Sequence, residues 1–143
     1  MIYKSIVGSR AYGLELPYSD TDIIQAVPIV GAKDYKENGL CVHDCSYEVF
    51  IEKAIGAPIN PYDLQMLFPK EFLLNNDLSL WITDNRESII KALKKEVYSG
   101  ILNKAQGLAY RGEHYYTRFP KRLAYSTHFA NMIYNYANGM PFA

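Results

Sequence analysis

The chain has 143 residues, of which 49% are hydrophobic, and its 15 Lys and Arg residues balance its 15 Asp and Glu residues. This length and apolar content predict one domain, spanning residues 1–143, with a buried core. The zero net charge argues against the broad basic surface of a duplex-binding protein, so duplex DNA is not an expected partner. The sequence offers neither a leader segment nor the roughly 20 apolar residues of a membrane span, so we expect no membrane partner and a cytoplasmic location, in a host cytoplasm if the protein is viral.

The first predicted elements surround a glycine-rich turn. Residues Ile2–Val7 are apolar and β-branched enough to form a strand, which leads into Gly8–Gly13 (GSRAYG). We expect a turn there, with a short helix around Ser9–Leu14. The glycines let backbone amides approach an anion closely, and the Ser9 hydroxyl and the helix N-terminus add donors. This segment therefore predicts a phosphate-binding site at Gly8 and Ser9.

Two carboxylates, Asp20 and Asp22, stand at the start of the next predicted strand, Asp22–Val27. Because strand residues alternate between faces, both carboxylates belong to the same face. Two like charges this close are costly without a cation between them, and Mg²⁺ prefers carboxylate and phosphate oxygens. We therefore expect Asp20 and Asp22 to be catalytic residues that bind Mg²⁺ or Mn²⁺.

The order of these motifs resembles a known signature. GSRAYG, a short spacer and Ser19–Asp22 (SDTD) are similar to the signature of the polymerase-β-like nucleotidyltransferase superfamily, and most similar to the small predicted nucleotidyltransferases of bacteria and phages. The similarity is clearest over Val7–Ile24. In that family a third acidic residue on a neighbouring strand completes a two-metal site. The resemblance implies transfer of a nucleoside monophosphate from a nucleoside triphosphate, with ATP expected, to an acceptor hydroxyl, with release of pyrophosphate.

A third predicted strand, Leu40–Cys45, supplies the candidate for the third acid. We expect Asp44 to be this metal ligand and catalytic residue, with Glu48 in the following helix as the alternative. Cys41, His43 and Cys45 share one face of the same strand, but a further zinc ligand is missing. We therefore expect free, buried thiols there rather than a zinc site.

Three further side chains, Arg10, Tyr12 and Lys53, are candidates for ligand contacts, and Gln65 departs from the family pattern. Arg10 can pair through two parallel hydrogen bonds with triphosphate oxygens or with a carboxylate of the site. Tyr12 is the tyrosine expected nearest the nucleotide, because it lies inside the signature. The resemblance also implies that Lys53 reaches a phosphate, whereas Gln65 stands where relatives tend to have Glu.

The remaining elements are predicted to be mostly helical, so the expected class is α+β, with a strand-rich catalytic core over 1–45 and a mainly helical part over 46–143. The charged segment Gly31–Gly39 is expected to be a hairpin-like connection or a flap beside the site. We expect Gly100 to interrupt the long helix and the last helix to stop at Asn138-Gly139. Four sequence signals mark the expected helix starts, namely Ser46, Asn60-Pro61, the capping-box pattern Asp84–Glu87 and Pro120.

The sequence leaves the acceptor open among a small molecule, a protein and an RNA end. A homo-oligomer or a partner subunit would complete the acceptor site of so short a chain. The alternative function is a non-catalytic nucleotide-binding module that acts through a protein partner. A phosphatase or nuclease that uses the same carboxylates is a weaker hypothesis, because it would leave the Gly-Ser turn without a task.

Overall fold

The computed structural model describes the backbone of residues 1–58, 60–114 and 119–138, and the side chains of these residues except 111–123. Strands come first along the chain and long helices follow. The fold is therefore α+β, as the sequence predicts. Among the described residues, no helix is both long and apolar enough to cross a membrane.

Five strands form one mixed sheet in the order β3-β4-β2-β1-β5. They are β1 (Tyr3–Val7), β2 (Thr21–Ala26), β3 (Ala32–Glu37), β4 (Leu40–Cys45) and β5 (Glu71–Phe72). Strands β2 and β4 are parallel, and the other neighbouring pairs are antiparallel. The parallel register of β2 and β4 decides which side chains of β4 lie beside the two signature aspartates.

Three predicted strands are confirmed, β1 and β2 to within one residue and β4 with the expected bounds. Of the two predictions for Gly31–Gly39, the hairpin is confirmed and the flap is wrong, and most of the segment forms edge strand β3, which was not predicted. Asn38 and Gly39 have φ angles of 50° and 77°, as the two-residue turn of a tight β-hairpin requires, and they join β3 to β4. The Asn-Gly pair is the sequence signal that favoured this hairpin. Strand β5 is too short to show a pattern.

The short helices begin where the sequence predicts. Helix α1 (Ser9–Tyr12) follows the glycine turn, and α2 (Tyr47–Phe50) continues into the π-helical segment η1 (Ile51–Gly56). Ser46 caps α2 by accepting a 3.1 Å hydrogen bond from the Val49 amide. Asn60 caps α3 (Pro61–Leu64) in the same way, through a 2.9 Å bond from the Tyr62 amide.

The long helices depart from the predicted bounds. They are α4 (Asp77–Ala92), α5 (Lys94–His114) and α6 (Phe119–Ala137). The capping box predicted at Asp84–Glu87 is wrong, because Asn76 and Ser79 cap each other at the start of α4 and the predicted segment lies inside that helix. Gly100 does not interrupt α5; the break falls at Leu93, whose φ is −108°. The predicted stop at Asn138-Gly139 is confirmed at Ala137, and Gly139 itself lies outside the described residues.

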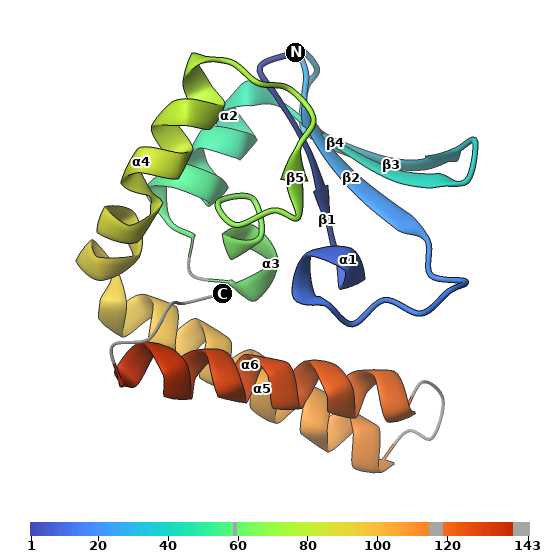
Figure 1. Ribbon diagram of the computed structural model, residues 1–143, viewed down its shortest axis with the longest axis vertical. Helices are drawn as coiled ribbons and strands as arrows, with labels where there is room; N and C mark the ends of the chain where they lie inside the picture. The colour runs from blue at the N-terminus through green and yellow to red at the C-terminus, as the bar shows by residue number, and fades with distance from the viewer. Residues whose placement is uncertain (59, 115–118, 139–143) are drawn as a thin grey trace.

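Two apolar clusters hold these elements together. The first joins one face of the sheet to α2, η1 and α4, and Tyr3 and Phe50 meet at its centre with ring centroids 4.4 Å apart. The second lies among α3, the C-terminal end of α4, α5 and α6. Figure 1 shows α2 and α4 to one side of the sheet and the α5–α6 pair running below α1 and α3. The face of the sheet that carries Tyr3 and Ile24 is therefore the inner face.

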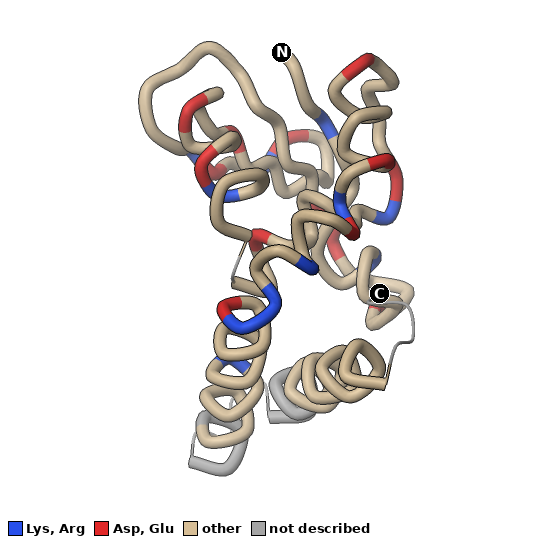
Figure 2. Tube along the Cα trace, turned by 90° about the vertical axis from the view of Figure 1, so that its left-hand side faces the viewer, with Lys and Arg blue, Asp and Glu red and all other residues tan. Residues whose placement is uncertain are grey.

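Charged positions are unevenly distributed over the molecule, and the described part of α6 differs from the rest. Figure 2 shows acidic and basic positions intermingled over the sheet and the shorter helices. The described side chains of α6, from residue 124 onward, include no Lys, Arg, Asp or Glu. The described part of α6 therefore brings no charged side chain to the molecule, whereas the neighbouring helix α5 carries several, Lys104 among them.

Candidate functional site

The predicted phosphate-binding turn joins β1 to α1 and packs directly against β2. Gly8 has φ 72° and ψ −146°, a backbone conformation that is strained for residues other than glycine. Val7 is the register partner of Asp22, so the turn starts beside that aspartate. A Cβ atom at Gly8 would collide with the Asp22 carboxylate. Glycine is therefore required both for the backbone conformation and for the close approach to Asp22.

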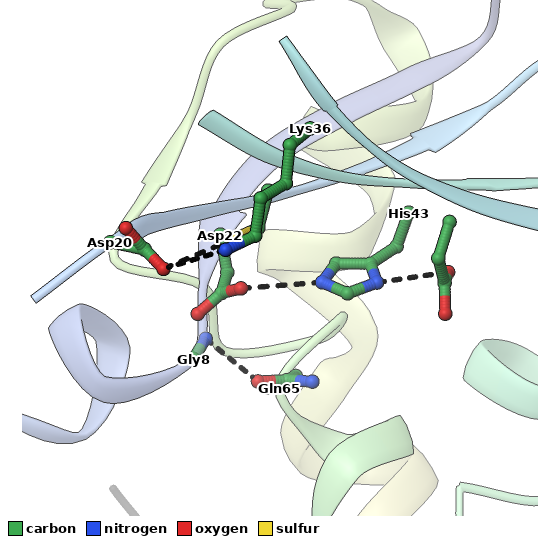
Figure 3. A network of polar contacts seen from close by, with 8 residues as sticks. Gly8, Asp20, Asp22, Lys36, His43 and Gln65 are labelled. Carbon is green, nitrogen blue, oxygen red and sulfur yellow. Dashed lines mark hydrogen bonds and ion pairs between the residues drawn. The ribbon is translucent and has the colours of Figure 1, made fainter. Parts of the chain in front are cut away.

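Asp20 and Asp22 turn to the same face of the sheet, as predicted. Asp20 Oδ2 lies 3.7 Å from Lys36 Nζ and accepts a 3.6 Å hydrogen bond from the Cys41 thiol. Asp22 Oδ1 lies 3.3 Å from His43 Nε2 (Figure 3). The side chain of Asp20 is 58% exposed and that of Asp22 is 29% exposed. Asp22 is therefore the enclosed member of the pair, and Asp20 is open to solvent.

Asp44, the predicted third ligand, lies on the opposite face of the sheet from Asp22. In the parallel register Asp44 pairs with Gln25, and its Oδ1 accepts a 2.8 Å hydrogen bond from Gln25 Nε2. Although Asp44 belongs to the residues that border the adjoining cavity, its carboxylate is engaged on the outer face. Glu48, the alternative, is exposed on α2. The structure therefore does not bring Asp44 or Glu48 together with Asp20 and Asp22.

His43 occupies the place beside Asp22 that the sequence analysis assigned to Asp44. Its Nε2 faces Asp22, and its Nδ1 lies 3.0 Å from Oδ1 of Asp34 on β3. Burial by itself lowers the pKa of His43, but the hydrogen bonds and charges of Asp34 and Asp22 outweigh burial and raise that pKa above its usual value. The imidazole thus bridges two carboxylates on the inner face.

Ser9 and Tyr12 are enclosed by aromatic side chains from α6. Ser9 is buried, and its hydroxyl is hydrogen-bonded with Tyr125. Burial raises the pKa of Tyr125 to about 12, although the bond with Ser9 lowers it. The Tyr12 ring packs against Tyr125 and Phe129, and its hydroxyl donates a 2.9 Å hydrogen bond to the Pro61 carbonyl. Helix α6 therefore packs against the Gly8–Gly13 turn through Tyr125 and Phe129.

Arg10 takes a different position from the predicted phosphate contact. Its Nε donates a 2.9 Å hydrogen bond to Thr21 Oγ1, and Nη2 donates another of 2.9 Å to the Ser19 carbonyl. Both partners flank Asp20. The guanidinium therefore fixes the segment that carries this aspartate.

A cavity of about 690 Å³ opens beside these residues. This volume falls in the range of about 300–1,000 Å³ that is usual for small-molecule sites. Its walls carry acidic, basic and aromatic groups, among them Gly8, Asp22, His43, Lys53, Tyr62 and Lys104. The Gly8 amide at this wall donates a 2.9 Å hydrogen bond to Gln65 Oε1 (Figure 3). The space is thus large enough for a nucleotide, and it is bordered by a glycine amide, two lysine side chains and an enclosed aspartate.

The residues present fit one divalent cation and not the predicted two-metal arrangement. Mg²⁺ is usually bound through one or two carboxylates together with substrate phosphates. Asp20 and Asp22 can provide the carboxylates. A second ion shared with Asp44 is inconsistent with the position of Asp44 on the outer face. Within the described ranges, no group of three or more His, Cys, Asp or Glu side chains is arranged to hold a metal by itself.

The sequence analysis missed the roles of His43, Asp34 and Tyr125. The alternation along β4 did place His43 on the face opposite Asp44, but only the pairing of β4 with β2 shows which face meets Asp22. Asp34 lay in a segment predicted to be a connection. Cys41 and Cys45 are free thiols, as predicted, but the prediction that they are buried is wrong, because both are partly exposed.

Comparison of the chain with protein-family models, with curated proteins and with solved structures finds no match.

Proposed function

We propose that the chain is a metal-dependent nucleotidyltransferase. It moves a nucleoside monophosphate from a nucleoside triphosphate, with ATP the expected donor, to an acceptor hydroxyl. The observation that carries the proposal is the packing of the Gly8 turn against Asp22 at the wall of a nucleotide-sized cavity. A metal–triphosphate complex needs amide donors for its phosphate oxygens and carboxylates for its cation, and both are present at this contact.

The Gly8 amide supplies the first contact to a phosphate oxygen. In the structure this amide donates to the side-chain oxygen Oε1 of Gln65, and a phosphate oxygen would be an acceptor of the same kind. The buried Ser9 hydroxyl supplies a second donor if it turns from Tyr125 to the ligand. Lys53 and Lys104 also border the cavity and bring two positive charges to a triphosphate.

Asp20 and Asp22 would hold the divalent cation, Mg²⁺ or Mn²⁺. The cation supplies neutralisation of the triphosphate charge when it is bound. Arg10 acts as a positioning residue, because its hydrogen bonds to the Thr21 hydroxyl and the Ser19 carbonyl hold the residues on either side of Asp20.

In the reaction, the acceptor oxygen forms a bond to the α-phosphorus while the bond from that phosphorus to the bridging β-phosphate oxygen breaks. Pyrophosphate leaves with the electron pair, and the hydroxyl proton passes to solvent. The protein contributes mainly by holding the donor in line and by balancing its charge. The acceptor remains a hydroxyl of a small molecule, a protein or an RNA end.

A second candidate function is nucleotide binding without transfer, through which the chain would act on a protein partner. It is favoured by a specific observation, namely that His43 rather than a carboxylate adjoins Asp22. A mechanism that needs a second cation on a third carboxylate would be impaired by this arrangement, whereas binding of one metal–triphosphate complex would not.

The test is label transfer from each of the four α-labelled nucleoside triphosphates, with Mg²⁺ or Mn²⁺, into a cell lysate separated into RNA, protein and small-molecule fractions. We expect label in one fraction, its loss in the Asp20→Ala/Asp22→Ala variant and its retention in Asp44→Ala. Absence of label, together with metal-dependent binding of the same triphosphates to the purified chain, would favour the second candidate. Absence of both label and binding would overturn both functions.

A further inference from the structure

Three neighbouring strands bring one imidazole and two carboxylates into line on the inner face. His43 on β4 lies between Asp22 on β2 and Asp34 on β3. The register explains the alignment, because Asp34 is the direct partner of His43 and Asp22 is the partner of Cys41, the preceding residue on the same face of β4. The arrangement is therefore built by the backbone rather than by flexible side chains reaching across solvent.

The spacing of Asp22 and His43 matches that of two ligands on one metal ion. Transition metals bind imidazole nitrogen and carboxylate oxygen at about 2.0–2.2 Å, so two such ligands at tetrahedral or octahedral angles lie about 3.0–3.4 Å apart. The distance from His43 Nε2 to Asp22 Oδ1 is 3.3 Å. The Gly8 turn lies against the other oxygen of Asp22, Oδ2, and leaves Oδ1 directed at the imidazole.

Asp34 provides the partner that a metal-binding histidine usually has. A ligating imidazole commonly donates its second ring N–H to a carboxylate, which fixes the tautomer and the ring orientation. Asp34 Oδ1 is 3.0 Å from Nδ1, the ring nitrogen that faces away from Asp22. With the proton on Nδ1, the lone pair of Nε2 points toward the Asp22 side.

We propose that His43 Nε2 and Asp22 Oδ1 form a transition-metal site, with Asp34 as the orienting carboxylate, and that this site prefers Mn²⁺ or Zn²⁺ to Mg²⁺. An imidazole ligand is the reason for the preference, because Mg²⁺ selects oxygen ligands whereas first-row transition metals accept nitrogen. The side chains of His43 and Asp22 are 41% and 29% exposed, so water can complete the coordination shell.

The site rests on the proposed function and deepens it, since phosphate oxygens of the bound nucleotide would take coordination positions that water would otherwise fill. The metal site itself is tested without nucleotide. Failure of metal binding and failure of the nucleotide reaction are therefore separate results.

The experiment measures binding of Mn²⁺, Zn²⁺ and Mg²⁺ to the purified full chain by calorimetry, with Co²⁺ absorption as a spectroscopic report of nitrogen ligation. We expect Mn²⁺ and Zn²⁺ to bind at least about tenfold more tightly than Mg²⁺. His43→Gln and Asp34→Asn should each weaken Mn²⁺ binding by about 10- to 100-fold, the usual effect of losing a ligand or its orienting partner. Asp44→Asn is the matched control, because it removes a carboxylate from the adjacent position of β4 on the other face, and it should leave binding unchanged.

A fourth variant keeps the test decisive if His43→Gln alters folding. His43→Asp replaces the nitrogen donor by oxygen and should shift the preference toward Mg²⁺. Equal affinity for Mg²⁺ and Mn²⁺ in the unmodified chain would overturn the proposal. A Co²⁺ spectrum that is the same with and without His43 would also overturn it, and would leave His43 as an imidazolium paired with two carboxylates.

Discussion

The two faces of the central sheet carry similar residues in different surroundings. On the inner face, Asp22 adjoins a cavity, the Gly8 turn and His43. On the outer face, one position further along β4, Asp44 pairs with Gln25. Strand register therefore decides the surroundings of each carboxylate in this fold, because a shift of one residue moves a side chain to the other face.

The largest difference between the faces should appear in nucleotide binding. Asp22→Asn removes the enclosed carboxylate at the turn and should weaken binding of Mg²⁺–ATP by about 30-fold or more, the loss expected when one partner of an enclosed charged contact is removed. Asp44→Asn should change it by less than about twofold, because that carboxylate faces Gln25. Titration calorimetry on both variants measures the ratio. Equal losses would mean that the two faces are not functionally distinct.

The close fit of the turn against Asp22 can be probed with two glycine variants. Gly13→Ala and Gly8→Ala both place a side chain at positive φ, 71° and 72°, but only the Cβ at Gly8 has a neighbour within 4 Å. We expect Gly13→Ala to cost about 1–2 kcal/mol of unfolding free energy. Gly8→Ala should cost about 1–3 kcal/mol more, because Asp22 must move and because Gly8, with ψ −146°, lies outside the left-handed helical region that Gly13 occupies with ψ 23°.

Urea unfolding of the two glycine variants measures this difference. A Gly8→Ala variant as stable as Gly13→Ala would contradict the close packing of the turn on Asp22. Binding of Mg²⁺–ATP should also be lost selectively in Gly8→Ala.

A smaller effect checks the start of α4. Asn76→Ala removes the side chain that accepts from the Ser79 amide and should destabilise the chain by about 1 kcal/mol. Asp84→Ala, at the capping box predicted from sequence, should change stability by less than about 0.5 kcal/mol, because Asp84 is exposed inside the helix. Thermal unfolding of both variants compares them directly. A larger loss of stability in Asp84→Ala than in Asn76→Ala would instead support the helix start predicted from sequence at Asp84.

The smallest expected effect concerns His128, which is half-buried beside the Tyr12 and Phe129 rings. Burial lowers the pKa of His128 in the folded state. Below about pH 6.5 the unfolded chain therefore binds a proton that the folded chain resists, and stability falls as the pH falls. His128→Gln should lose less stability than the unmodified chain between pH 7 and pH 5, as followed by urea unfolding. A steeper loss in the variant would contradict the sign.

How far the sequence predicts the molecule depends on how local each signal is. The strand before Gly8, the Asp20–Asp22 pair on one face and the Ser46 and Asn60 caps depend on neighbouring residues, and the structure has them where expected. The identity of the residue beside Asp22 depends on pairing between distant strands. Alternation alone left Asp44 and His43 equally placed, and the resemblance favoured the acid.

The helical half shows the same limit of local signals. Asp84–Glu87 has the residue types of a capping box, but Asn76 and Ser79 form one earlier in the chain, and packing extends α4 from there. Gly100 remains helical because its neighbours Val97 and Ile101 are buried between α5 and its partners. Tertiary burial thus overrides the cost of a glycine within a helix.

The central claim is that the inner face of β2 and β4, at the Gly8 turn, binds a metal-loaded nucleotide. The most direct measurement is a crystal structure of the full chain with Mn²⁺ and an ATP analogue whose α–β bridge is not cleavable, with the ion located by its anomalous signal. The account predicts the triphosphate against the Gly8 amide, in place of Gln65, and Mn²⁺ within about 2.2 Å of Asp22. An ion bound at Asp44, or a triphosphate bound away from Gly8, would contradict it.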